Sequence, residues 1–409
     1  MAASSQETIA VVGAGQAAGQ LISSLRSAGF EGRIRLFGEE PSLPYQRPPL
    51  SKEYLAGEMS AEQLAILQPE FYENAAVELS LGTRIEAIDR EAKRLLITGG
   101  ESVAYDKLAL TTGARVRRLG APGEARDGIH VLRTIADVDA IRAGFAPGRR
   151  LAIVGGGYIG LEVAAVAVKL GLVVTVLELA DRVMNRVVCP EVSAFYQQEH
   201  ESQGVRILTG TAVSAFEEGE GGAIRVLCGD APPLEADIVV VGVGILPEVS
   251  LAEAAGLDVQ NGILVDAFAR TSDPDIVAAG DCTNHINQLL EGRVRLESVQ
   301  NANAQARVAA ATLCGQEAPY AELPWFWSQQ YDLKLQIVGL SQGYDQTVIR
   351  GAPEERAFAA YYMKQGVLIA ADAVNSPRDF MMARKLIAAK ARIDPARLAD
   401  TSVPLRALA

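Results

Sequence analysis

Two glycine-rich loops, each set between a buried strand and a helix, restrict this chain more than any other feature of its sequence. The first lies in TIAVVGAGQAAGQL at residues 8–21, and the second in LAIVGGGYIGLEVAA at residues 151–165. In each, an apolar run typical of a buried parallel strand leads into closely spaced glycines, and apolar residues then recur at helical spacing. Strand–turn–helix units of this kind bind dinucleotides when an acidic residue ends the next strand. The sequence therefore predicts two dinucleotide sites.

The glycines and acids of both units occupy the positions that this chemistry needs. Gly13 permits the tight turn and Gly15 lets the backbone approach a pyrophosphate, while the helix behind them points N–H groups at the phosphates. The second loop repeats the spacing with three glycines, Gly155, Gly157 and Gly160. Glu39 and Glu178 end the following strands, where a carboxylate accepts hydrogen bonds from a ribose.

Glu178 also indicates which nicotinamide cofactor binds. A carboxylate at this position holds the ribose 2′-hydroxyl of NAD and repels a 2′-phosphate, whereas NADP sites favour an arginine. Arg182 follows shortly afterwards and weakens the argument. NADH is the expected cofactor of the second site.

Composition excludes several other classes of protein. A chain of 409 residues is long enough for two or three domains, and its formal net charge of -12 argues against a general nucleic-acid binder. No apolar run reaches the roughly 20 residues of a membrane span, and no basic segment precedes the first strand, so we expect a cytoplasmic protein without a membrane partner. The four cysteines (Cys189, Cys228, Cys282, Cys314) form no C-x-x-C pair, and the three histidines show no metal-ligand spacing. We expect reduced thiols, no metal, and a monomer or weak dimer.

Two further motifs carry a resemblance to a known family. They are LALTTGA at residues 108–114 and TSDPDIVAAGDC at residues 271–282. With the two glycine loops, in this order, the chain resembles the FAD-dependent pyridine-nucleotide oxidoreductases of the glutathione-reductase fold. The resemblance implies an α/β fold with two Rossmann-type dinucleotide-binding domains and a C-terminal α+β domain. The first loop would then hold FAD and the second NAD.

Three longer segments narrow the resemblance to the oxygenase-coupled ferredoxin reductase branch. They are LPYQRPPLSKEYLAG (43–57), ESVQNANAQAR (297–307) and PWFWSQQYDLKLQIVGL (324–340). This branch implies an enzyme that passes electrons from NADH through FAD to a [2Fe-2S] ferredoxin, which supplies a cytochrome P450 or a ring-hydroxylating dioxygenase. A rubredoxin reductase remains an alternative. So does an NADH-sensing flavoprotein without turnover, similar to apoptosis-inducing factor.

One departure from the disulfide reductases of this fold decides how electrons leave. Those enzymes carry a redox cysteine pair after the first dinucleotide unit, but residues 40–60 here contain no cysteine. A dithiol relay is therefore not expected, and electrons must leave from the flavin itself.

The resemblance also assigns individual residues. Lys52 and Glu162 are the expected catalytic pair beside the flavin ring; the alternative for Lys52 is a solvated surface lysine. Tyr158 either shields the flavin face or simply packs. The FAD contacts would be Gly13, Gly15, Ala17, Glu39, Arg47, Lys52, Ile85, Arg133, Asp281 and Val299. The NAD contacts would be Gly156, Gly157, Tyr158, Ile159, Glu178, Gly244 and Glu297.

The motifs predict the domain limits and an electron-exit surface. FAD binding would use residues 1–115 and 245–323, NAD binding residues 116–244, and the C-terminal domain residues 324–409. Trp327 and Arg307 are the expected exit residues, although Trp327 and its neighbour Trp325 equally suit a buried core pair. Residues 378–397 carry six basic and two acidic side chains. This excess of positive charge suits either a solvated helix face or a docking surface for an acidic ferredoxin.

Overall fold

The computed structural model describes residues 7–229, 231–287, 289–290 and 292–408, which group into two compact units. The first unit comprises Met1–Arg47, Glu62–Arg115 and Leu246–Pro324, and the second Pro48–Ala61, Val116–Ile245 and Trp325–Ala409. The motifs assigned the short segment Pro48–Ala61 to the FAD-binding domain, whereas the structure groups it with the second unit. It packs in the second unit, and it carries Lys52 there.

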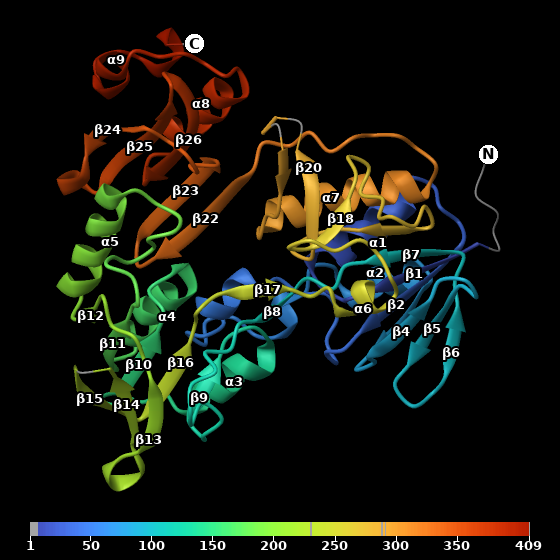
Figure 1. Cartoon of the computed structure of the whole chain (residues 1–409), viewed down its shortest axis with the longest axis horizontal. Helices are drawn as coiled ribbons and strands as arrows, with labels where there is room; N and C mark the ends of the chain where they lie inside the picture. The colour runs from blue at the N-terminus through green and yellow to red at the C-terminus, as the bar shows by residue number, and fades with distance from the viewer. Residues whose placement is uncertain (1–6, 230, 288, 291, 409) are drawn as a thin grey trace. The chain divides into compact units, whose positions relative to one another are not determined.

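A five-stranded parallel sheet forms the centre of the first unit (Figure 1). Its strands, in spatial order, are β19 (Ile276–Ala278), β7 (Lys107–Leu110), β1 (Thr8–Val12), β2 (Arg33–Gly38) and β3 (Val77–Leu81). Successive side chains of β1 point to opposite faces. Ile9 and Val11 belong to one buried core, and Ala10 and Val12 to the other.

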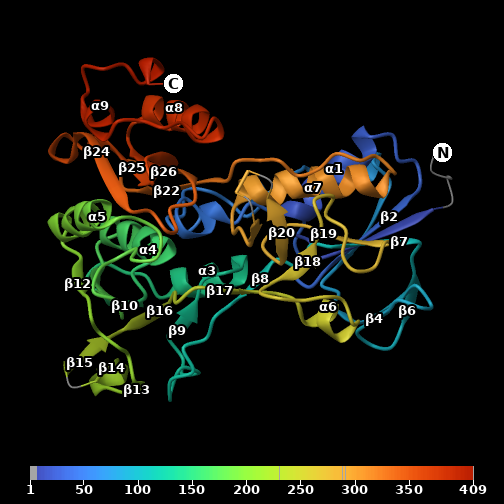
Figure 2. The same cartoon turned by 45° about the horizontal axis from the view of Figure 1, so that its top comes forward.

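Helices and small sheets cover both faces of this central sheet. Helices α1 (Gln16–Ser27) and α7 (Val299–Leu313) lie side by side over the face of Ile9 and Val11, as Figures 1 and 2 show. The opposite core receives side chains from β4 (Ile85–Asp89), β5 (Arg94–Ile97), β6 (Ser102–Ala104) and α6 (Ser250–Ala254). The unit also contains α2 (Pro69–Asn74) and a sheet of β18 (Ile263–Val265), β20 (Thr283–Asn287) and β21 (Gly292–Val294).

The second unit repeats this sheet, except that its edge strand β9 (Ile129–Val131) comes before the other strands in the chain, whereas β19 comes last. Its parallel strands, in spatial order, are β12 (Arg206–Leu208), β11 (Val173–Leu177), β10 (Arg150–Val154), β16 (Ile238–Val241) and β9. As in the first unit, the strand before the glycine loop pairs with the strand after the following helix. The helices are α3 (Ile135–Ala143), α4 (Tyr158–Lys169) and α5 (Pro190–Ser202), and a small antiparallel sheet is formed by β13 (Ala215–Glu218), β14 (Ile224–Cys228) and β15 (Ala231–Ala236). This repetition confirms the predicted α/β class with two dinucleotide-type sheets.

The C-terminal residues form an antiparallel sheet within the second unit. Its strands, in spatial order, are β22 (Trp325–Gln330), β23 (Leu333–Gly339), β26 (Val367–Val374), β25 (Ala357–Lys364) and β24 (Gln346–Ala352). Helix α8 (Pro377–Ala388) packs on this sheet through Phe380, Ala383 and Ile387, the apolar face predicted from the sequence, and α9 (Pro395–Ala399) follows (Figure 2). Across the described residues, no helix combines the length and the apolar character needed to cross a membrane.

Candidate functional site

The first glycine loop has the geometry of a phosphate cradle. Gly13 has a φ of +103°, and a Cβ there would lie 2.4 Å from the Thr111 carbonyl oxygen, so only glycine fits. Gly15 precedes α1 and provides no side chain to cap it, and nothing lies within 4 Å of the position its Cβ would take. No side chain of the N-cap residue therefore occupies the first N–H groups of α1. This arrangement fits the pyrophosphate of a dinucleotide.

The Gly280–Asp281 turn and helix α7 contribute residues next to the start of α1. Ala17 is buried, and a Cβ at Gly280 would lie 3.3 Å from its methyl group. Gln305 of α7 accepts a hydrogen bond of 2.8 Å from the Gly280 N–H and so holds the turn that carries Asp281. Val299 is the first residue of α7. Two of the predicted FAD residues lie on these parts of the chain. Val299 begins α7, which packs against α1, and Asp281 lies in the turn that follows β19.

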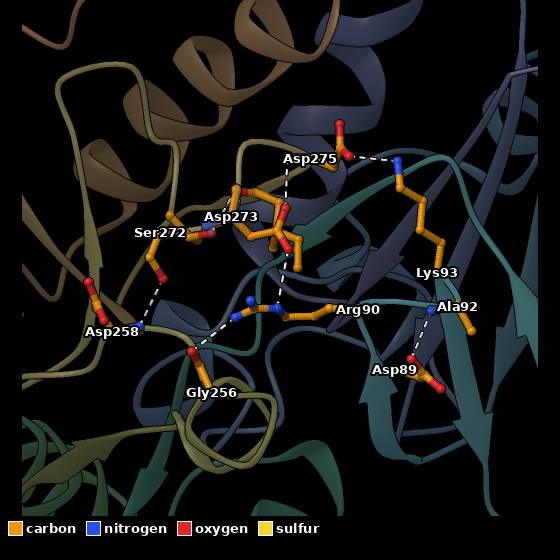
Figure 3. A network of polar contacts seen from close by, with 11 residues as sticks. Asp89, Arg90, Ala92, Lys93, Gly256, Asp258, Ser272, Asp273 and Asp275 are labelled. Carbon is orange, nitrogen blue, oxygen red and sulfur yellow. Dashed lines mark hydrogen bonds and ion pairs between the residues drawn. The ribbon is translucent and has the colours of Figure 1, made fainter.

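Polar contacts hold the loop that leads to Asp281, as Figure 3 shows. Arg90, in the turn between β4 and β5, pairs with Asp273 at 3.2 Å, and Lys93 pairs with Asp275 at 2.6 Å. Both acids directly precede β19, the strand that leads toward Asp281. The β4–β5 turn therefore restrains the first residues of the TSDPDIVAAGDC segment (271–282).

Arg47 belongs to a compact polar group in the first unit. Its guanidinium donates to Glu40 at 2.7 Å and to the Tyr45 hydroxyl at 2.9 Å, and that hydroxyl donates to Glu40 at 2.6 Å. Burial opposes the charge of Arg47, but Tyr45, Glu40 and Asp281 together raise the pKa of its guanidinium. The predicted ribose acid, Glu39, is instead exposed and pairs with Arg84 at 3.0 Å. Sequence reasoning missed Glu40, although it stands directly beside Glu39.

Ile85, the other predicted FAD residue of this unit, is the first residue of β4 and is 4% exposed. It belongs to the core on the β4 side of the central sheet. Its side chain therefore packs, and only its backbone is available for a ligand contact.

The second glycine loop reproduces the first in the second unit. Gly155 has a φ of +111°, and a Cβ there would lie 2.4 Å from the Gly242 carbonyl oxygen. Gly157 precedes α4 without a side-chain cap and also has nothing within 4 Å of its Cβ position. Ile159, in the first turn of α4, is 42% exposed. Gly244 has a φ of +105°. An uncapped helix and an exposed apolar side chain beside it fit a bound dinucleotide.

Glu178 contacts the backbone of this second loop. Its carboxylate accepts hydrogen bonds from the Gly156 N–H at 2.6 Å and from the Ala180 N–H at 2.8 Å. The guanidinium of Arg182 donates to the carbonyl groups of Val188 and Asn185, each at 2.9 Å. The acid therefore lies beside the predicted phosphate loop, whereas the nearby arginine is held by its own segment.

Lys52 and Glu162 form a buried ion pair. The Lys52 ammonium lies 2.7 Å from Glu162 Oε2, and their side chains are 14% and 4% exposed. Ser51 donates to the same oxygen at 2.5 Å, and Ser328 of β22 donates to Oε1 at 2.7 Å. Sequence reasoning missed both serines. Each lies in a motif that signalled the family, Ser51 in PPLSK and Ser328 in PWFWS.

Tyr158 begins α4, and its ring centroid lies 5.0 Å from that of Phe326. Its hydroxyl is buried, and among the described residues it has no hydrogen-bond partner. Burial and the nearby Asp372 raise the pKa of this hydroxyl well above its usual value. A buried donor without a partner is uncommon in a folded protein.

The two units divide the predicted site residues between them. The first unit contains Gly13, Gly15, Ala17, Glu39, Arg47, Ile85, Asp281, Glu297, Val299 and Arg307. The second contains Lys52, Arg133, Gly156, Gly157, Tyr158, Ile159, Glu162, Glu178, Gly244 and Trp327. Glu297 is exposed and pairs with Arg295, and the Arg133 N–H donates to Asp137 at 3.0 Å. Glu297, predicted for NAD, therefore lies in the unit of the first cradle.

The predicted exit residues are accessible. Trp325 and Trp327 are both half-buried, with ring centroids 5.6 Å apart, so neither belongs to a fully buried core. Arg307 is exposed on α7.

All four cysteines are free, and burial raises the pKa of each thiol, to about 11 for Cys189.

Two uncapped glycine cradles, each on its own parallel sheet, define a protein with two dinucleotide-binding domains. Residues 7–306 match the pyridine nucleotide-disulphide oxidoreductase family, and residues 325–409 match a domain described as reductase C-terminal. The chain belongs to the pyridine nucleotide-disulphide oxidoreductase family. Membership implies a flavin and a nicotinamide nucleotide as cofactors.

Similar proteins extend over nearly the whole chain. A ferredoxin–NAD(P)+ reductase of Sphingomonas sp. is 43% identical over 400 residues, which cover 97% of this chain and 96% of that protein. The ferredoxin–NAD+ reductase component of the anthranilate 1,2-dioxygenase system of Burkholderia cepacia is 45% identical, covering 98% of this chain and 99% of its own. The solved covalent complex of putidaredoxin reductase with putidaredoxin superposes with a TM-score of 0.95 at 42% identity, over 99% of this chain and 98% of that one. These comparisons confirm the resemblance drawn from the motifs.

Proposed function

We propose that this chain is an FAD-containing NADH:ferredoxin oxidoreductase that supplies electrons to a cytochrome P450 or a ring-hydroxylating dioxygenase. The observation that carries the proposal is the pair of open cradles combined with the absence of cysteine in residues 40–60. Relatives that match nearly the whole chain are named as ferredoxin reductases, and one solved neighbour is a putidaredoxin reductase in a covalent complex with putidaredoxin.

The first unit is proposed to bind FAD. The N–H groups at the start of α1 would hold the pyrophosphate behind Gly15, and Asp281 would accept from the ribityl chain. Arg47, held by Glu40 and Tyr45, is a further charged group in the same unit. A bound flavin supplies the conversion between a two-electron hydride donor and one-electron acceptors.

The second unit is proposed to bind NADH. Gly156 and Gly157 lie at the start of α4, where the N–H groups would hold the pyrophosphate, and Ile159 and Gly244 border the loop. Glu178 would accept from the ribose and exclude a 2′-phosphate. Tyr158 would move aside when the nicotinamide binds.

Lys52 and Glu162 are proposed to act on the flavin site through charge. The pair keeps an ammonium group in a largely buried position, where a positive charge stabilises developing negative charge better than in water. Hydride transfer needs alignment and electrostatics rather than a nucleophile, so no further catalytic group is required.

The partner is proposed to be a [2Fe-2S] ferredoxin that docks transiently on a basic surface. In α8 and the residues after it, Asp379 is engaged by Tyr361 at 2.8 Å and Asp394 caps α9, while Arg378, Lys385 and Arg392 are exposed. Trp327 and Arg307 are the proposed exit residues. We place the enzyme in the cytoplasm, as a monomer or weak dimer.

The test is made on the purified protein with a matched pair of variants. We expect a yellow protein with stoichiometric FAD that NADH bleaches without oxygen, and that reduces a [2Fe-2S] ferredoxin. Gly15→Val, which fills the first cradle, should lose FAD, whereas Gly157→Val should keep FAD and lose reduction by NADH. A colourless protein unable to take up FAD contradicts the proposal. If NADH reduces the bound FAD but no electrons reach ferredoxin or rubredoxin, an NADH-sensing flavoprotein is favoured. If rubredoxin is reduced and ferredoxin is not, the enzyme is a rubredoxin reductase.

A further inference from the structure

A line of hydrogen bonds reaches Glu162 from the opposite side of the Lys52 contact. Ser328 of β22 donates to Glu162 Oε1 at 2.7 Å, and the Gln330 side-chain amide donates to the Ser328 hydroxyl at 3.2 Å. Gln330 Oε1 lies 2.8 Å from His200 Nε2, and His200 Nδ1 lies 2.9 Å from the Tyr331 hydroxyl. We call these four residues, Ser328, Gln330, His200 and Tyr331, the Glu162 relay.

The relay is buried for most of its length. His200 is 0% exposed, Gln330 and Ser328 are each 1% exposed, and Glu162 is 4% exposed. Tyr331, in the turn after β22, is half-buried and ends the line. Polar side chains as deeply buried as these need partners, and here each partner is another member of the same line.

Two separate parts of the chain supply the relay, and a third supplies Glu162. Ser328 and Gln330 stand two residues apart on β22, so both point to the same face of the C-terminal sheet. His200 comes from the last turn of α5, and Glu162 from α4. The C-terminal sheet thereby contacts, through its first strand, the acid that holds Lys52.

The chemistry of each group sets the direction of every hydrogen bond. The Glu162 carboxylate can only accept, so Ser328 must donate its single hydrogen to it and can only accept elsewhere. The Gln330 NH2 group then donates to the Ser328 hydroxyl. Because the NH2 group is used there, Gln330 Oε1 is the atom that faces His200. A carbonyl oxygen can only accept, so His200 must carry a hydrogen on Nε2.

The last link follows from the state of the imidazole. Burial lowers the pKa of His200, although the Gln330 hydrogen bond opposes that change, and a neutral ring results. With its hydrogen on Nε2, a neutral His200 accepts at Nδ1 from the Tyr331 hydroxyl. Every donor in the line therefore points toward Glu162.

We propose that Ser328, Gln330 and His200 are positioning residues that hold the Glu162 carboxylate, and through it the Lys52 ammonium, in a single orientation. The inference rests on the proposed function of the Lys52–Glu162 pair and extends it to the residues hydrogen-bonded behind Glu162. One carboxylate oxygen is held by the relay, which leaves the other for Ser51 and Lys52.

The first test reads the tautomer of His200 in the flavin-loaded protein by nitrogen NMR of labelled histidine. The chain has only three histidines, and the His200 signal is the one lost in His200→Gln. We expect the Nε2–H tautomer near neutral pH. In Gln330→Glu, the new carboxylate should favour a cationic ring with hydrogens on both nitrogens. An Nδ1–H tautomer or a cationic ring in the unmodified protein overturns the relay.

The second test uses a matched pair of buried serines. Ser328→Ala removes the donor to Glu162, whereas Ser193→Ala removes a buried hydroxyl that donates to the Val183 carbonyl at 2.6 Å, outside the relay. We expect Ser328→Ala to slow anaerobic reduction by NADH about tenfold at unchanged KM, since misplacement of a charged group costs rate rather than binding. Equal rates for the two variants overturn the proposal. If the unmodified protein binds FAD but NADH does not reduce it, the proposed function fails, and the tautomer still decides the relay.

Discussion

At the scale of single residues, Glu178 is the side chain whose surroundings bear most directly on cofactor choice. Its carboxylate lies on the N–H of Gly156, at the start of the second cradle, so a 2′-phosphate bound there would meet a negative charge. Arg182, the residue that might have offset this charge, donates to the carbonyl groups of Val188 and Asn185 instead. Both observations favour NADH over NADPH.

Replacing Glu178 with alanine should therefore reduce the preference for NADH. We expect the ratio of kcat/KM for NADH to that for NADPH to fall by about tenfold, the effect of about 1.4 kcal/mol of differential binding. Glu39→Ala is the matched control, because it removes the strand-ending acid of the other cradle and should leave the ratio unchanged. Comparable efficiency with both cofactors in the unmodified enzyme would contradict the assignment.

Asp372 gives the second residue-scale prediction, which concerns stability and pH. Burial raises the pKa of this carboxyl to about 7, although the hydrogen bond from Tyr362 opposes the rise. In the unfolded chain the pKa is near 3.8, so between these values only the folded protein keeps the proton. Its contribution to stability is therefore complete below about pH 4 and is lost as the pH rises toward 7.

Asp372→Asn keeps a neutral side chain of the same shape at every pH. The variant should melt several degrees above the unmodified protein at pH 8, since one kcal/mol shifts Tm by about 2–4 °C in a unit of this size. The difference should shrink toward pH 4. Thermal melting followed across this pH range measures it, and a difference that grows on acidification would show that Asp372 is ionised in the folded protein.

At the scale of elements, α8 shows how a helix can pack and still present charge. Phe380, Ala383 and Ile387 face the sheet, while Arg378 and Lys385 are exposed. Arg384 behaves differently, because its guanidinium lies 5.9 Å from the Phe380 ring centroid and is half-buried. The exposed pair, not Arg384, is therefore the part of α8 that an acidic partner would meet.

Charge reversal at this exposed pair tests the docking surface. Arg378→Glu combined with Lys385→Glu should slow ferredoxin reduction about tenfold at low salt, and Arg307→Glu should act in the same direction. Lys334→Glu, on an exposed position of β23, is the control for the single reversal Arg307→Glu, because each changes the net charge by two units. The unmodified rate should also fall with salt, since exposed charges more than about 10 Å apart are screened at 0.1 M. Rates with ferricyanide should stay constant, and a salt-independent ferredoxin rate would indicate an apolar dock around Trp327 instead.

At the scale of the whole molecule, local signals were predictable and distant contacts were not. The glycine loops, their strands and the apolar face of α8 depend on neighbouring residues, so periodicity and turn chemistry sufficed to predict them. The contact between Lys52 and Glu162 joins positions 110 residues apart and came only from resemblance. No local pattern marks the link between His200 and Gln330, 130 residues apart, or the packing of Pro48–Ala61 with the second unit, because tertiary contacts alone create them.

The family includes disulfide reductases, so the four thiols deserve a test on the whole enzyme. None lies in residues 40–60, three are buried, and burial raises the pKa of every one, which disfavours the thiolate needed for attack. Alkylation of the native protein at neutral pH should therefore leave ferredoxin reduction nearly unchanged. Cys314, the only half-buried thiol, is the one expected to react slowly, and Cys314→Ser should abolish that labelling at full activity. If alkylating a single cysteine stopped electron transfer while FAD stayed bound, electrons would have to pass through a thiol, and direct transfer from the flavin to ferredoxin would be wrong.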